Sequence, residues 1–137
     1  MYYFAKMEKD TDGITVSFRD IPEAITCGQT LEEAKFMAED ALLTAIEFYF
    51  EDNKFIPSPS QPHEGEIAVY FPDGAYSKVL LHNALLEKNI SEVQLANAIG
   101  ASSFEIQGIL DVRQLTKIDV VGKALNAIGK NLCMSVE

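Results

Sequence analysis

The residues that could bind a metal ion or attack a substrate are few and widely separated. The sequence contains two cysteines, Cys27 and Cys133, and two histidines, His63 and His82. A structural zinc site needs about four converging ligands, usually with pairs of cysteines a few residues apart. Neither cysteine has such a neighbour. We therefore expect two reduced thiols and no zinc site. Separately, we expect no other metal, no cofactor and no catalytic residue.

The segment 92–111 (EVQLANAIGASSFEIQGILD) has the spacing of a helix-turn-helix, in which two short helices cross at close range. Ala96 is small enough for a close crossing, and Gly100 can take the positive φ that a tight turn needs. Ile106 and Ile109 would then face inward from the second helix. An ordinary helical hairpin with a glycine turn remains the alternative.

A helix-turn-helix implies DNA binding, because its second helix enters the major groove with its first residues against the bases. Glutamine can read adenine, and serine can contact a base or a phosphate. No Lys or Arg lies in 102–109, so a single copy would bind poorly and a homodimer is predicted. Lys78 and Lys88 could also contact phosphate, or could simply make the surface soluble. The predicted DNA contacts are Ser102, Ser103, Glu105, Gln107, Arg113 and Lys117.

Composition limits the remaining function classes. The chain has 137 residues, 47% of them hydrophobic, which is enough for one or two small domains. It has 21 acidic and 11 basic residues, and a net charge of -10 rules out a uniformly basic nucleic-acid binder. Residues 1–70 hold 14 acidic and 5 basic residues, whereas 71–137 hold 7 and 6. This asymmetry suggests two regions with different partners, a basic protein for the first and a polyanion for the second.

The first region alternates strand-like and helical patterns. Apolar and polar residues alternate in the segment 14–18, and Thr30-x-x-Glu33 is a capping box at the start of a helix that runs to about Asn53. Three prolines in 55–65 indicate an extended surface connector. The other predicted strands are 2–7, 24–28 and 66–71, the last of which can rejoin the sheet.

The long helix of the first region carries two lines of residues besides its core positions. Phe36, Leu43 and Phe50 form an apolar line. The acidic stripe consists of Glu33, Asp40, Glu47 and Glu51. Such a stripe fits either a solvated face or a docking surface, and the sequence leaves both open.

The second region is all helical apart from a possible strand at 132–136. The segment 75–87 is a predicted helix with core positions Val79, Leu80, Ala84 and Leu86, and a last helix starts at Thr116 and stops near Gly129. Ser91-x-x-Gln94 and Ser102-x-x-Glu105 are capping boxes that start two short helices between them. We therefore predict an α+β chain, with a small antiparallel-rich sheet and one helix in 1–72 and an all-α helix-turn-helix domain in 73–137. No signal peptide and no membrane span are apparent, which favours a cytoplasmic protein.

Three segments together resemble the HicB family of antitoxins: VSFRDIPEAITCGQTLEEA at 16–34, EDALLTAIEFYFEDNKFIPSPS at 39–60 and SKVLLHNALLEKNISEVQLANAIG at 77–100. The resemblance implies a degenerate ribonuclease H-like first domain that binds and occludes a HicA-type toxin, a small basic protein that cleaves mRNA. It also implies a second domain that represses the operon by binding promoter DNA, and a homodimer or higher homo-oligomer.

Toxin contacts are expected in an apolar and acidic set from the first region. The set comprises Ile21, Pro22, Glu47, Phe48, Phe50 and Glu51, and Tyr49 is a further apolar candidate. For each apolar member, a place in the core is the alternative.

Two other functions remain open at this point. A ribonuclease H-type, metal-dependent nuclease would need carboxylates such as Asp12 or Asp20, yet the first strand has none and Asp10, Asp12, Asp20 and Glu23 lie in expected turns. A plain helix-turn-helix regulator would use the first domain to sense a small ligand.

Overall fold

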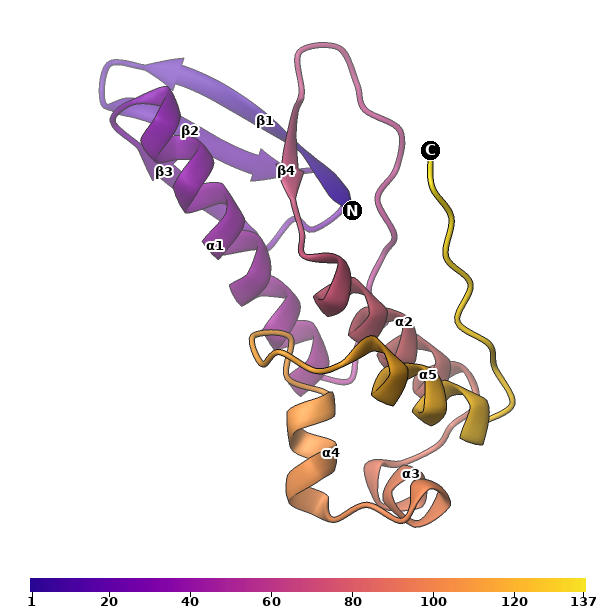
Figure 1. Ribbon diagram of the computed structural model, residues 1–137. Helices are drawn as coiled ribbons and strands as arrows, with labels where there is room; N and C mark the ends of the chain where they lie inside the picture. Colours follow the sequence, from indigo (N-terminus) through magenta and orange to yellow (C-terminus); the bar gives the residue numbers. More distant parts are fainter. The chain divides into compact units, whose positions relative to one another are not determined.

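A computed structural model describes residues 1–137 and divides the chain into two compact units. Unit 1 contains Met1–Asp52 and Ile56–Pro72, and unit 2 contains Asn53–Phe55 and Asp73–Glu137. Unit 1 combines a sheet with one helix, and unit 2 contains only helices (Figure 1). The predicted α+β fold class with a helical second part is confirmed.

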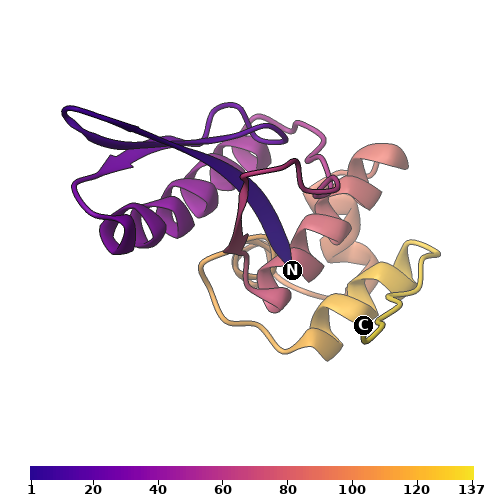
Figure 2. The same ribbon diagram turned by 90° about the horizontal axis from the view of Figure 1, so that it is seen from above.

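Unit 1 is built on a four-stranded antiparallel sheet with the order β3-β2-β1-β4. A long hairpin of β1 (Tyr2–Asp10) and β2 (Gly13–Phe18) forms its centre (Figure 2). β3 (Ile25–Gly28) pairs with β2, and β4 (Ile67–Tyr70) returns to pair with β1. The prediction that the fourth strand rejoins the sheet is therefore confirmed.

The helix α1 (Leu31–Glu51) packs on β3, β2 and β4 and so covers one face of this sheet. Thr30 caps it, because its hydroxyl accepts a hydrogen bond from the Glu33 amide at 3.1 Å. Burial of the facing apolar side chains provides the main driving force for this packing. The helix contributes Ala34, Ala38, Leu42, Ala45, Ile46 and Tyr49 to the core, and the sheet contributes Tyr3, Ala5, Val16 and Phe18.

Unit 2 consists of four helices around one apolar core. They are α2 (Asp73–Glu87), α3 (Glu92–Ile99), α4 (Ser103–Ile109) and α5 (Ile118–Ala127). Both predicted capping boxes form, with Ser91 and Gln94 at α3 and Ser102 and Glu105 at α4. The core includes Leu81, Leu85, Leu95, Ile106, Ile109, Val121 and Leu125.

The structure differs from the sequence-based expectation at three places in unit 2. Leu80 is exposed and Leu86 only partly buried, because the helix turns Leu81 and Leu85 into the core instead. The helix α5 begins at Ile118 rather than Thr116. The predicted strand at 132–136 is wrong, since that segment has no regular structure and pairs with no strand of the sheet. None of the helices is long and apolar enough to cross a membrane.

Candidate interaction sites

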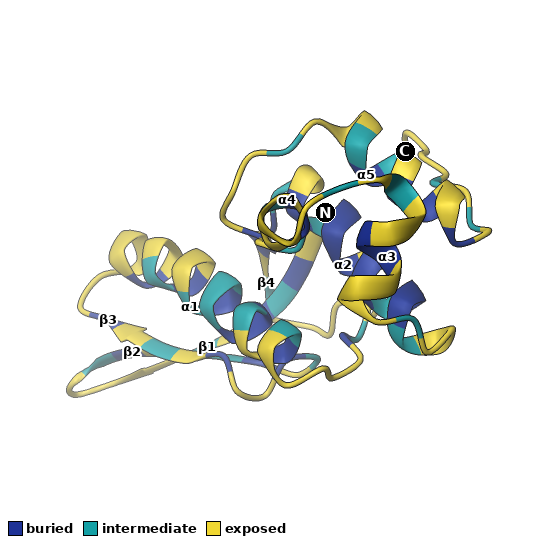
Figure 3. Ribbon diagram, turned by 90° about the horizontal axis from the view of Figure 1, so that it is seen from below, coloured by how far each residue is buried: buried dark blue, intermediate teal, exposed yellow.

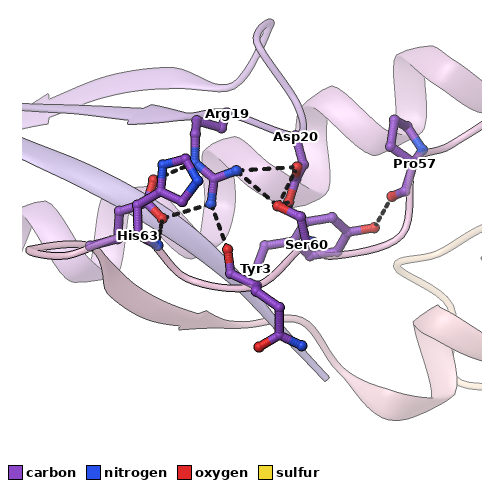
Figure 4. A network of polar contacts seen from close by, with 8 residues as sticks. Tyr3, Arg19, Asp20, Pro57, Ser60 and His63 are labelled. Carbon is purple, nitrogen blue, oxygen red and sulfur yellow. Dashed lines mark hydrogen bonds and ion pairs between the residues drawn. The ribbon is translucent and has the colours of Figure 1, made fainter.

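A polar clasp holds the proline-rich connector of unit 1 against the end of β2. Arg19 donates to both carboxylate oxygens of Glu66, from Nε and from Nη2, each at 2.8 Å (Figure 4). The same guanidinium donates to Ser60 Oγ and to the Gln61 carbonyl, both at 2.9 Å. Asp20 accepts from the Ser60 amide at 2.8 Å. The connector has no regular secondary structure, and a charge-assisted bidentate pair fixes it in place.

This clasp should make the stability of unit 1 sensitive to acid. The hydrogen bonds from Arg19 lower the pKa of Glu66 from 4.5 to about 2. Because the folded-state pKa is depressed, the contribution of Glu66 is fully present above pH 4.5 and disappears as the pH falls toward 2. We expect Glu66→Gln to lower the thermal midpoint at pH 7 and to matter progressively less below pH 4.5. An equal difference between wild type and variant at pH 7 and pH 3 would contradict this.

The loop after Asp20 is hydrogen-bonded to α1, and it buries Ile21, one of the predicted toxin contacts. The Tyr49 hydroxyl donates to the Glu23 carboxylate at 2.6 Å, and burial together with this bond raises the Tyr49 pKa to about 12. Pro22 is exposed, but Ile21 is completely buried. The prediction that Ile21 contacts a partner does not fit this burial, whereas Pro22 stays a candidate.

The predicted contacts at the end of α1 are arranged around its surface. Phe48 is 56% exposed, and Glu51 is also exposed. Glu47 and Phe50 are partly buried, while Tyr49 faces the sheet and belongs to the core. The end of α1 thus presents aromatic and acidic side chains together at the surface. These four residues stay candidates for a protein contact.

Three of the four carboxylates considered for a nuclease, those of Asp10, Asp20 and Glu23, accept structural hydrogen bonds. Asp10 accepts from the Asp12 amide in the hairpin turn at 2.8 Å. Asp20 holds Ser60, and Glu23 holds Tyr49. No group of three or more Asp, Glu, His or Cys side chains is arranged to hold a metal ion. The two cysteines are free thiols at the surface.

In unit 2, α3 and α4 are joined by a tight turn centred on Gly100. This glycine has φ 67° and ψ 33°, a left-handed conformation that a side chain would disfavour. The Ala101 amide donates to the Ala96 carbonyl at 2.9 Å, which closes the end of α3. Ser102 then caps α4, with its hydroxyl accepting from the Glu105 amide at 3.1 Å. The turn therefore fixes the direction of α4 relative to α3.

The predicted DNA contacts all lie at the surface of unit 2, but they differ in their local roles. Ser102 and Glu105 are mutually hydrogen-bonded in the capping box, so part of their polar capacity is already used. Ser103 and Gln107 are exposed one turn apart on α4. Arg113 and Lys117 are exposed in the segment that follows. The 82% exposed Phe104 also lies on this helix.

Lys78 overturns the expectation that it could contact phosphate. It is 1% exposed, and its ammonium donates to the carbonyls of Gly108, Asp111 and Gln114 at 3.0, 2.7 and 2.7 Å. Burial lowers the Lys78 pKa, which the charge of Asp111 partly offsets. A cation at the end of α4 also meets the negative end of the helix dipole. Lys78 therefore links α2 to the end of α4 and to the segment that follows it.

Comparisons with known protein sequences agree with one another. A family model described as "HicB_like antitoxin of bacterial toxin-antitoxin system" matches residues 2–80. The chain is 48% identical to Antitoxin HicB 2 of Photorhabdus laumondii over 96% of this chain and 94% of that protein. It is 47% identical to Antitoxin HicB of Escherichia coli K12 over 89% and 88%, and 32% identical to that of Pseudomonas fluorescens over 98% and 93%. All three relatives are named as antitoxins and none as an enzyme.

Proposed function

The chain belongs to the HicB-like antitoxin family, and from this premise we propose that it binds a HicA-type toxin and covers the surface with which that toxin cleaves mRNA. The observation that carries the proposal is similarity along nearly the whole chain to named antitoxins. The acidic surplus of residues 1–70 supports it, since complementary charge speeds the encounter with a basic protein. Occlusion requires no chemistry from the antitoxin, and we expect it to act in the cytoplasm, where mRNA is translated.

Inhibition of RNA cleavage tests this proposal directly. The full chain, mixed in excess with the product of the adjacent small reading frame, should abolish that protein's cleavage of a reporter RNA. Continued cleavage at saturating antitoxin would contradict the proposal. A plain regulator would leave cleavage unchanged, and a ribonuclease H-type nuclease would itself degrade the RNA once Mg²⁺ is added.

We further propose that unit 2 represses its own operon as a dimeric helix-turn-helix. Supporting observations are the left-handed Gly100 turn, the capped α4 and the exposure of Ser103 and Gln107 on it. Two copies on a palindrome would double the number of contacts, which compensates for the absence of Lys and Arg from α4.

DNA binding by this surface should depend on Gln107 and Arg113 in different ways. Gln107→Ala should lower the preference for promoter over scrambled DNA by about 1–3 kcal/mol, because a base contact is lost. Arg113→Ala should weaken binding to both DNAs. It should also lower the slope of the logarithm of the binding constant against the logarithm of the salt concentration by about one. Lys9→Ala, an exposed cation of unit 1, is the matched control. Equal retention of promoter and scrambled DNA by the wild type would refute the proposal.

A further inference from the structure

A line of apolar side chains runs along α1 on the side that does not pack on the sheet. Phe36, Leu43 and Phe50 are seven residues apart, which is nearly two helical turns, so they lie one above another. Phe36 is 72% exposed, and the other two are partly buried. We name these three residues the α1 seam. Figure 3 shows that the exposed positions of α1 lie opposite its buried face.

The seam is not needed for the core of unit 1. A separate set of six α1 residues, which includes Ala38 and Leu42, already makes the contact with the sheet. The exposed Phe36 adds nothing to the contact with the sheet, and an exposed aromatic side chain lowers the solubility of a protein. Exposed apolar patches bordered by polar residues are typical of protein interaction sites.

Acidic side chains border the seam on both sides. Glu33, Asp40 and Glu47 repeat with the same seven-residue spacing along one side, and Glu32 and Glu39 lie along the other. Lys35 is the only cation of α1; it lies three residues after Glu32 and four before Glu39, on the outer side of this second row and not in the seam. The surface is therefore an apolar line between two anionic rows.

This charge pattern decides among the possible occupants. DNA, RNA and anionic lipid headgroups are repelled by the acidic rows. A second copy of α1 would place like charges against each other, which costs free energy at an interface. A protein partner with an apolar ridge bordered by Lys and Arg side chains would complement both the apolar seam and the acidic rows.

We propose that the α1 seam is the surface on which the toxin docks, through an apolar ridge with basic edges on the toxin. The inference rests on the proposed antitoxin function and assigns that function to one face of unit 1. Phe36 and Phe50 would supply most of the affinity, since buried aromatic anchors dominate interface energetics. The acidic rows would mainly raise the association rate and fix orientation.

The test measures binding of the full chain to a catalytically inactive form of the toxin. Phe36→Ala keeps a good helix former in α1, so folding should be preserved. The double variant Glu39→Lys and Asp40→Lys reverses charge in both rows. Matched controls on the other face of the sheet are Ile25→Thr, at a 64% exposed site in β3, and Glu8→Lys in β1. Circular dichroism and thermal unfolding confirm that each variant is folded.

We expect Phe36→Ala to weaken binding at least about tenfold, mainly through faster dissociation. The charge-reversal variant should associate about tenfold more slowly at low salt and lose most of the salt dependence. Both controls should stay within about twofold of the wild type. If the wild type binds the toxin and all variants bind it equally well, the toxin does not dock on the α1 seam, but the proposed antitoxin function stands. If the wild type does not bind the toxin at all, both are overturned.

Discussion

Replacing Lys78 with methionine should lower the free energy of unfolding of unit 2 by about 3 kcal/mol or more. Methionine fills a similar volume but donates no hydrogen bond, so three carbonyls at and beyond the end of α4 lose the bond from the ammonium. The carbonyls of Gly108 and Asp111 still accept from backbone amides. A hydrogen bond that involves a charged group contributes about 1.5–3 kcal/mol, so the loss of three such bonds accounts for the expected change. Urea unfolding followed by circular dichroism measures the difference.

The same variant should separate the two proposed activities. The lost bonds fix α4 and the segment that carries Arg113 and Lys117, so promoter binding should fall more than toxin inhibition. Lys123→Met on α5, an exposed lysine of the same unit, is the control and should change stability by less than about 0.5 kcal/mol. Unchanged stability of Lys78→Met would show that water or other donors replace the ammonium.

The helices of unit 2 could be predicted from local signals, whereas the contacts of Lys78 at the end of α4 could not. Each capping box and the Gly100 turn are encoded within a few residues, and both form as expected. Lys78 contacts carbonyls 30 to 36 residues away, which no local pattern reveals. A lysine within the apolar run 75–86 was the available signal, because a buried cation requires specific partners. Reading it as a surface phosphate contact was the natural but wrong interpretation.

Unit 1 shows the same division between local and long-range information. Alternation in 14–18 and the Thr30 cap predicted the hairpin and α1, while the bidentate pair of Arg19 and Glu66 joins residues 47 apart. For Ile21 the burial agrees with the core alternative, although the residue stands beside Pro22 in a loop, where exposure is the usual expectation. The buried Ile21 lies in a turn that is closed by a hydrogen bond from the Ala24 amide to the Ile21 carbonyl.

The close approach of Gly28 in β3 to the start of α1 gives the second large prediction, that Gly28→Ala disrupts the packing of α1 on the sheet. A Cβ atom on Gly28 would lie 2.5 Å from the Ala34 amide nitrogen and 2.8 Å from its Cα. Both are backbone atoms of the first turns of α1, so no side-chain rotation relieves the overlap. The conformation of Gly28 is not left-handed, and the cost is therefore purely steric. Overpacking of this kind typically costs about 1–3 kcal/mol.

The matched control is Gly74→Ala in the first turn of α2, where an added Cβ meets nothing within 4 Å. There alanine should be neutral or stabilising by up to about 1 kcal/mol, because it favours the helix. Guanidinium unfolding compares the two variants with the wild type. Because the start of α1 must shift to admit the methyl group, Gly28→Ala should also weaken toxin inhibition at protein concentrations where the variant is still folded. A Gly28→Ala protein as stable as Gly74→Ala would mean that β3 and α1 can separate without cost, and α1 could then not serve as a rigid docking element.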